Sequence, residues 1–322
     1  MFKALLLWLS VTLLLTGCAQ PIRKGMPVGA EGKIISNYTF TGVFHQIHIS
    51  KRPAKILVCG ENAADTLIAL GQGDAIHTLV LTEPMERQSY RKMLPKADVY
   101  PASLSQEAVL TLHPDFILAM RRFFDPKVLG DVNFWESNGI PAYIQDASGP
   151  IPSLGNFPPC TVESEIQFLK NMGSVFQQEE KVDCLVRDIQ ASFEVDPSVR
   201  QGKPKVLVVE FMPNVIEAFG RSLLSGDIVT KLGGEILTYK APFISMEELL
   251  MADADVVFIV YHGGEDEKQN ALGKINRTAF QGMSAVRNHR IYAIPYNRMV
   301  ATGIHTKETI LFFKQGMYPK KK

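Results

Sequence analysis

The sequence contains few cysteines, and their spacing excludes the common metal and redox sites. Four cysteines occur among 322 residues. Cys59, Cys160 and Cys184 form none of the CxxC or Cys/His patterns of a zinc or dithiol site. A protein in an oxidising compartment can oxidise one pair of these thiols, and the sequence leaves the pairing open. Cys59 ends an apolar run, so it is also typical of a small buried hydrophobe.

The sequence also lacks an excess of charge of either sign. Its 34 lysines and arginines nearly balance its 33 aspartates and glutamates, for a formal net charge of +1. This balance excludes the basic footprint of a nucleic-acid-binding protein. Hydrophobic residues make up 46% of the chain and charged residues 21%, which is typical of a globular protein.

The motifs of common enzyme classes are missing as well. No GxxxxGK[ST] or GxSxG motif occurs, and Gly71 and Gly73 follow a helical pattern, so they cannot form a dinucleotide-binding turn. His262, before two glycines, resembles part of a hydrolase oxyanion loop, but no nucleophile accompanies it. His45 and His48 have the spacing of half a metal site, without carboxylates or cysteines to complete it. The sequence therefore predicts neither an enzyme nor a cofactor of its own.

Long hydrophobic runs are absent except at the N-terminus. The run from Ala4 to Leu15 is shorter than the roughly 20 residues that a membrane-spanning helix needs, so it indicates a signal peptide. It ends in Leu-Thr-Gly-Cys18, which resembles the lipobox of bacterial lipoproteins; cleavage elsewhere is the alternative. The lipobox predicts removal of residues 1–17, lipidation of Cys18, and attachment to the cell membrane on its extracytoplasmic face. Residues 18–50 are then tether and lead-in, with the tether reaching to about Ser36.

Two regions of the remaining chain alternate short apolar strands with helical patterns. In residues 51–160 the expected strands are 56–59, 76–81, 116–120 and 142–145, and the expected helices are 63–70, 106–112 and 125–138. In residues 202–322 the expected strands are 205–210, 215–219, 256–260 and 291–294, and the expected helices are 225–232, 245–251 and 306–316. Such βαβ series predict mostly parallel sheets covered by helices. The fold class is therefore α/β, with two Rossmann-like lobes.

Residues 161–201 lie between the lobes and have apolar residues at helical spacing from Val162 to Phe193. Glu163 and Glu165 stand in the first turn, where acidic residues suit the helix dipole. This pattern predicts one long linking helix, with Gly173 as the point of any bend.

An internal repeat supports the division into two lobes. Glu107 precedes a short apolar helix and then Asp115 before a strand, and Glu247 and Asp255 repeat this arrangement. Each glutamate suits the positive end of its helix dipole, so both can be ordinary first-turn acids. Their matching places in the two lobes also suggest a role outside the fold.

Several segments resemble the substrate-binding proteins of ABC importers for iron complexes and vitamin B12. Individual motifs are modest, but their order covers nearly everything from Pro53 to Pro319. The segments are Pro53–Val58, Leu70-Gly71, Glu107–Asp115, Leu232–Glu235, Ala285–Tyr292 and Tyr318-Pro319.

This resemblance implies a rigid monomer in which one long helix joins two lobes around a ligand cleft. It implies an ABC permease and its ATPase as partners, with Glu107 and Glu247 docking on permease arginines; Glu248 is an adjacent alternative. An iron chelate would be bound as transported ligand. At Gly60-Glu61-Asn62 the sequence departs from the family's usual Ser-Pro pair, which leaves the ligand contact of Glu61 and Asn62 open.

The segment Ala254–Glu265 is similar to one in a Gram-positive haem-uptake lipoprotein, whose histidine at the place of His262 ligates haem iron. Imidazole is chemically suited to iron. The methionine that completes the ligand set there is replaced by Ala102, and Tyr100, Met85 or Met299 would have to substitute. A hydrogen-bonding role for His262 is the alternative to ligation.

The ligand cleft is expected at the carboxyl ends of the strands. Arg121, Arg122 and Phe123 follow a strand and suit an anionic or aromatic ligand, although a solvated basic turn gives the same pattern. The other expected ligand-binding residues are Glu61, Asn62, Tyr100, Arg221, Tyr261, His262, Tyr296 and Arg298.

The primary hypothesis is a non-catalytic lipoprotein that binds a ferric siderophore or haem for an ABC importer. Corrinoid binding is the first alternative, and binding of a free metal ion ranks below it because a His/Asp ligand set is missing. An exported hydrolase on the same scaffold, or an adhesion lipoprotein, would belong to a different class of protein.

Overall fold

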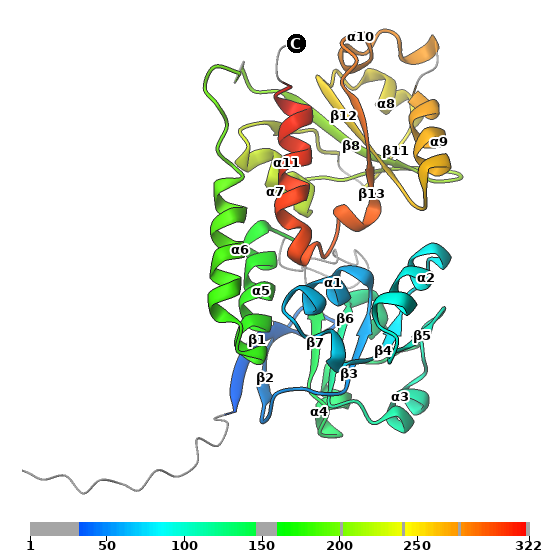
Figure 1. Cartoon of the computed structure of the whole chain (residues 1–322). Coiled ribbons are helices and arrows are strands. Elements are labelled where there is room, and N and C mark those ends of the chain that lie inside the picture. The colour runs from blue at the N-terminus through cyan, green and yellow to red at the C-terminus, as the bar shows by residue number, and fades with distance from the viewer. Residues whose placement is uncertain (1–31, 146–159, 200–201, 240–241, 276–277, 320–322) are drawn as a thin grey trace, which may run out of the picture.

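The computed structural model describes residues 32–145, 160–199, 202–239, 242–275 and 278–319. Two α/β lobes lie one above the other, with two helices, α5 (Val162–Phe176) and α6 (Glu179–Ala191), along one side (Figure 1). The expected leader and Cys18 lie outside the described residues. Across the ranges given above, no helix is both long enough and apolar enough to cross a membrane. The predicted α/β fold with two lobes is confirmed.

The N-terminal lobe is built on a five-stranded parallel sheet of order β5-β4-β3-β6-β7. Its central strands are buried because helices cover both faces, which is why they are apolar along their whole length. The strands are β3 (Ile56–Cys59), β4 (Ile76–Val80), β5 (Asp98–Tyr100), β6 (Phe116–Met120) and β7 (Ala142–Gln145). The helices are α1 (Glu61–Ala69), α2 (Pro84–Met93), α3 (Gln106–Leu112) and α4 (Val132–Ser137), with short 3-10 turns η1 (Gly73–Ala75) and η2 (Arg121–Phe124).

A β-hairpin precedes this sheet where a tether reaching to about Ser36 was expected. Strands β1 (Lys33–Tyr38) and β2 (Phe44–Ile49) pair antiparallel. The hairpin is fixed to the lobe because Asn37 donates to the Ile144 carbonyl at 2.8 Å and the Ser36 carbonyl accepts from Asn171 of α5 at 2.9 Å. The alternating burial of β1 was hidden by its short length, so the tether prediction was wrong from Lys33 onward.

The C-terminal lobe contains a mostly parallel sheet of order β11-β9-β8-β12-β13, with β10 also paired to β8. Strands β9 and β11 run antiparallel to their neighbours. The strands are β8 (Lys205–Phe211), β9 (Ile216–Ala218), β10 (Glu235–Ile236), β11 (Phe243–Ile244), β12 (Val256–Tyr261) and β13 (Ile291–Pro295). The helices are α7 (Leu224–Lys231), α8 (Met246–Met251), α9 (Glu265–Ile275), α10 (Ser284–Arg287) and α11 (Thr306–Met317), with 3-10 turns η5 (Thr278–Phe280), η6 (Tyr296–Arg298) and η7 (Gly303–His305).

The connection between the lobes is a pair of helices rather than the single long helix expected for residues 161–201. Helix α5 ends at Gln177, which adopts the left-handed conformation (φ 57°, ψ 45°), and α6 then packs back along α5. Gly173 is the contact point and not the bend, since a Cβ there would lie 2.8 Å from the Val182 side chain. A non-glycine residue closes the helix, so no glycine marks the point where the chain reverses.

The two lobes and the helix pair share one continuous hydrophobic core. It includes Leu67 of the N-terminal lobe, Phe168 of α5, Val182 of α6 and Phe313 of α11, all of them buried. Two smaller cores fill the outer faces of the two sheets. Because the shared core reaches both lobes, separating the lobes would expose apolar surface at a cost of about 25 cal/mol per Å².

A polar junction crosses from one lobe to the other beside this core. The segment that follows β13 passes over α1, where Asn62 Nδ2 donates to the carbonyl of Asn297 at 2.6 Å. Both carboxylate oxygens of Glu165 in α5 accept backbone N–H groups from this segment, from Thr302 at 2.7 Å and from Gly303 at 2.8 Å. Glu165 is fully buried, so these hydrogen bonds are what makes its burial tolerable.

Replacing Gly303 by alanine is expected to weaken this junction. Gly303 has φ +50°, and a Cβ there would lie 2.5 Å from Thr66 Oγ1. We expect Gly303→Ala to lower the free energy of unfolding by about 2 kcal/mol or more. The matched control is Gly273→Ala in α9, where a Cβ meets nothing within 4 Å and alanine favours the helix by about 1 kcal/mol. Equal urea midpoints for the two variants would contradict the close packing at Gly303.

Glu165 should make stability depend on pH. Burial raises the pKa of Glu165 to about 7, although the bonds from Gly303 and Thr302 lower it. The folded protein then holds this proton more tightly than the unfolded chain, so the free energy of unfolding should fall as the pH rises from about 4.5 to 7. The group contributes at most about 3 kcal/mol over that range. Urea unfolding at pH 5 and pH 7.5 should show this loss in the wild type and not in Glu165→Gln; the same loss in both would refute it.

Candidate functional site

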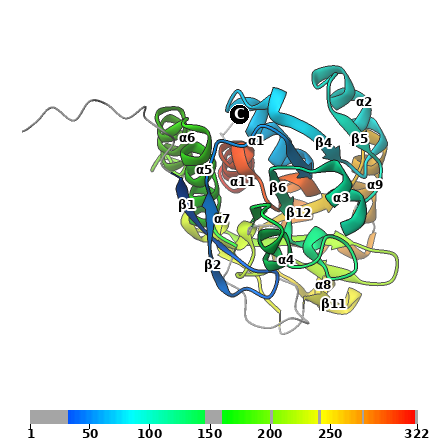
Figure 2. The same cartoon turned by 90° about the horizontal axis from the view of Figure 1, so that it is seen from below.

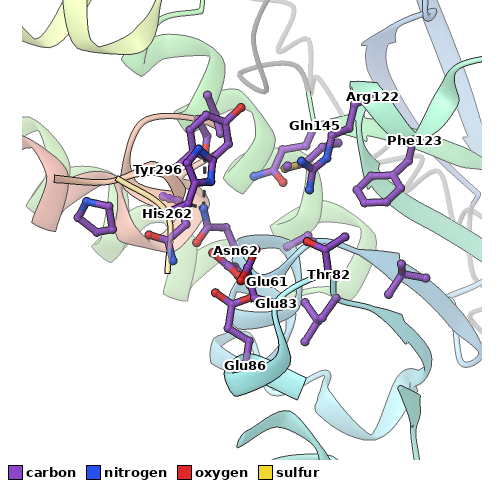
Figure 3. A pocket seen from close by; sticks show the side chains of 18 of the residues that line it. Glu61, Asn62, Thr82, Glu83, Glu86, Arg122, Phe123, Gln145, His262 and Tyr296 are labelled. Atoms are coloured by element: carbon purple, nitrogen blue, oxygen red, sulfur yellow. Dashed lines mark hydrogen bonds between the residues drawn. The ribbon is translucent and has the colours of Figure 1, made fainter. Parts of the chain in front are cut away.

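A cleft opens between the lobes at the carboxyl ends of β3, β4, β6, β12 and β13. It encloses about 810 Å³ of space, part of it open to solvent. Figure 3 shows side chains from both lobes pointing into this space. The lining residues that the following paragraphs use are Glu61, Asn62, Glu83, Glu86, Arg122, Phe123, Gln145, Tyr261, His262, Tyr296 and Asn297.

The turn from β3 into α1 forms the floor on the N-terminal side. Gly60 has φ 121°, a conformation that favours glycine, and a Cβ there would contact Met120. This turn places Glu61 and Asn62 at the start of α1, both in the cleft lining as predicted. Asn62 is 4% exposed and is used to hold Asn297, so it positions the opposite lobe as well as lining the cleft.

An acidic cluster of Glu61, Glu83 and Glu86 lies on the same side. Glu83 occupies the N-cap position of α2 without a side-chain capping bond, and Glu86 stands in the first turn, so two helix N-termini meet at the cleft with acidic side chains. Burial, a hydrogen bond with Glu61 and the Glu61 charge raise the pKa of Glu86 to about 9. The charges of Glu83 and Asp65 act in the same direction. Glu86 therefore holds its proton more tightly than an ordinary glutamate does.

Only one of the two neighbouring arginines reaches the cleft. Arg122 is exposed and lines it, with its guanidinium 4.9 Å from the centroid of the Phe123 ring. Arg121 is 2% exposed and donates to the Phe40 carbonyl at 3.4 Å. The expectation that Arg121 lines the cleft is therefore wrong, because the 3-10 turn η2 directs consecutive side chains to different sides.

The C-terminal side of the cleft is formed by a histidine stacked on a tyrosine. The rings of His262 and Tyr296 are 4.4 Å apart and 24° from parallel. His262 Nε2 donates to Glu210 Oε1 at 3.1 Å, and this bond raises the pKa of His262 against the opposing effect of desolvation. Tyr261 lies beside them at the end of β12. The wall therefore offers aromatic faces and one imidazole.

Three other predicted ligand-binding residues lie outside the cleft lining. Tyr100 is on the edge strand β5 and packs on the core of the outer sheet face. Arg221 lines a separate hollow of the C-terminal lobe with Lys203 and Asp227. Arg298 lies next to the cleft but is engaged at the lobe junction, with Nη2 3.5 Å from Glu308. The sequence pattern alone does not show which side of each lobe these residues face.

The structure adds no further candidate ligand for a metal ion among the described residues. Within the described ranges, no group of three or more His, Cys, Asp or Glu residues is arranged to hold a metal ion. Met299, a candidate second haem ligand, is 2% exposed in the shared core, and the side chain of Met85 lies outside the described residues. In the part of the chain that the structure resolves, Cys59, Cys160 and Cys184 form no disulfide.

The two repeated glutamates lie on helices that face away from α5 and α6. Glu107 on α3 and Glu247 on α8 are both exposed, and Figures 1 and 2 place these helices at opposite lobes on the side remote from the helix pair. Glu248 is used locally, since its Oε2 accepts from the Ser245 N–H at 2.8 Å in a capping box. Glu248 therefore has a local capping role.

Comparison with solved structures shows the fold. A periplasmic binding protein from Veillonella parvula superposes with a TM-score of 0.78 at 24% identity, covering 90% of this chain and 92% of that chain. The petrobactin-binding protein YclQ from Bacillus subtilis gives 0.67 at 18% identity, covering 91% and 100%. The catecholate-siderophore binding protein VctP from Vibrio cholerae gives 0.67 at 16% identity, covering 88% and 99%.

Sequence comparisons give the family. No curated protein sequence matches the chain. The profile of the periplasmic binding protein family matches residues 56–297, which include both sheets and the cleft between them. The chain therefore belongs to the periplasmic binding protein family.

Proposed function

We propose that this protein is the extracytoplasmic binding component of an ABC importer and holds an iron chelate between its lobes. The observation that supports this best is the cleft itself, which both lobes line at the carboxyl ends of their strands. Its walls combine aromatic faces with a few charged groups, as sites for organic ligands do. Iron would arrive as part of the ligand, so the protein needs no metal site of its own.

The names of similar structures favour an iron chelate over a corrinoid. The Bacillus subtilis and Vibrio cholerae structures are named for petrobactin and for catecholate siderophores. In this protein Phe123, Tyr261 and Tyr296 provide aromatic surface for the organic part of such a chelate. Corrinoid binding stays an alternative that the binding experiment below decides.

For haem, the surroundings of His262 favour a hydrogen bond over ligation of the iron. The bond to Glu210 raises the pKa of His262 and so opposes the neutral imidazole that iron requires, although Nδ1 has no bond to Glu210. The candidate second ligand, Met299, is buried in the shared core. A hydrolase would need a nucleophile, and no serine or cysteine is found among the described residues that line the cleft.

Delivery to a permease is proposed to use Glu107 and Glu247. Both are exposed carboxylates on short helices, one on each lobe, and neither forms an ion pair within the described chain. Such carboxylates can pair with arginines of a membrane partner. Lipidation of Cys18 would hold the monomeric protein at the extracytoplasmic face of the cell membrane.

A binding panel tests the ligand class. At least one of ferric hydroxamate, ferric catecholate, haem and cobalamin should quench the intrinsic fluorescence of the protein without its leader. Tyr296→Ala should weaken that binding by about 10-fold through loss of aromatic contact, while the exposed Phe44→Ala of the β-hairpin should not. With haem, an unchanged Soret band in His262→Ala is expected. No binding across the panel would refute the ligand class.

A transport assay tests the docking surface. Glu107→Ala and Glu247→Ala together should abolish uptake of the bound chelate while its affinity for the protein stays within about two-fold, because neither residue lines the cleft. The matched control is Glu180→Ala on α6, which lies on the side away from α3 and α8. Loss of chelate affinity in the double variant would contradict a docking role.

A further inference from the structure

The charges that reach the cleft differ from those expected for an anionic ligand. Of the arginines predicted there, only Arg122 lines it, whereas the acidic cluster of Glu61, Glu83 and Glu86 lines the N-terminal side. No lysine or arginine of the described chain forms an ion pair with these three carboxyl groups, and the nearby Arg298 pairs with Glu308. The carboxyl groups that line the cleft are therefore gathered where the N-terminal lobe faces the ligand.

The acidic cluster also occupies the positions where an anion would otherwise bind. The N-termini of α1 and α2 both point into the cleft, and free helix N-termini attract anionic groups. Here Glu61 is the first residue of α1, and Glu83 and Glu86 occupy the start of α2. Carboxyl groups at these positions compete with an anionic ligand for the two helix ends.

A buried amide gives independent evidence that the ligand brings hydrogen-bond donors. Gln145 lines the same cleft and is 1% exposed. Its Nε2 donates to the Ala301 carbonyl at 2.8 Å, which orients the amide, and its buried Oε1 has no hydrogen-bond partner in the described structure. Figure 3 shows this amide in the cleft wall between Tyr296 and Arg122. An unmet buried acceptor costs about 1–3 kcal/mol unless a donor reaches it.

From these observations we infer that the ligand has a cationic hydrogen-bond donor, a protonated amine or amidinium, that binds at Glu61, Glu83 and Glu86. This inference rests on the proposed function and specifies the chelate as one with a pendant ammonium-like group. The remainder of the chelate lies toward Gln145, Tyr296 and Arg122, where its N–H or O–H groups reach Gln145 Oε1.

The protonation state of Glu86 gives this inference a measurable consequence. The groups around Glu86 are Glu61 of α1, Glu83 before α2, and Asp65 and Tyr90, whose hydroxyl donates to Asp65. A cation placed here stabilises the ionised carboxylate, so Glu86 should release its proton when the ligand binds. Affinity for a cationic ligand should then rise between pH 7 and pH 9, while a primary amine is still protonated.

Two hydroxamate chelates that differ at one group provide the test. Ferrioxamine B has a protonated terminal amine, and its N-acetyl derivative is neutral at that place with the same iron centre. By isothermal titration at pH 7.5, ferrioxamine B should bind at least 10-fold more tightly than the N-acetyl form. Glu61→Gln/Glu86→Gln should remove that preference, and Glu265→Gln, which removes an exposed charge on α9, should retain it. The calorimetric titration is repeated in two buffers that differ in ionisation enthalpy. The difference in binding heat should show proton release with ferrioxamine B and none with the N-acetyl form.

The outcomes separate this inference from the proposed function. Equal affinity for the two ferrioxamines, or a preference that survives in Glu61→Gln/Glu86→Gln, would overturn the inference while chelate binding stands. Binding of trianionic ferric enterobactin but of neither ferrioxamine would overturn it in the same way. If no chelate, haem or cobalamin binds at all, the proposed function fails and the inference fails with it.

Discussion

The carboxylate of Glu165 is the interaction on which the relation between the two lobes depends. It lies on α5, which packs on both lobes, and it binds two consecutive backbone N–H groups in the segment after β13. That segment would otherwise place unpaired donors in a dry environment. With the segment held, Asn297 meets Asn62, and Tyr296 and His262 are fixed opposite α1. One buried carboxyl group thus holds the segment that joins the two walls of the cleft.

The charges in the cleft follow from this arrangement. Each helix that begins at a strand end brings its N-terminus to the cleft, and acidic residues stabilise such ends. In an isolated helix Glu61 and Glu86 would be ordinary first-turn acids. Because β3 and β4 are neighbours in the sheet, the helices after them begin side by side, and the two carboxyl groups share a proton. An acidic residue that suits each helix separately thus becomes one of a pair of carboxyl groups whose protonation is linked.

The sequence predicted the elements whose apolar runs were long or clearly bounded. The bounds of β6, β7 and α3 match expectation, since glycine, proline or serine flanks them. The helix expected over residues 125–138 is only α4. Helices α2 and α9 were missed because few of their residues are apolar and they cover the edges of the sheets. The reversal at Gln177 was missed because the chain uses no glycine there.

The site was predictable only where a strand end determines it. Glu61, Arg122, His262 and Tyr296 each come one or two residues after a core strand, and each lines the cleft. Arg121 shows the limit of that reasoning, because one residue along a 3-10 turn separates a buried side chain from an exposed one.

The position of α11 has a consequence for how the chain acquires its structure. Helix α11 is the last element in sequence, yet Phe313 and Ile310 fill the centre of the shared core against α6 and α7. The C-terminal lobe and α6 cannot complete their packing before this helix exists, so during synthesis this half of the protein stays loosely organised until its final turns leave the ribosome. Folding of this half should then be a late, cooperative event.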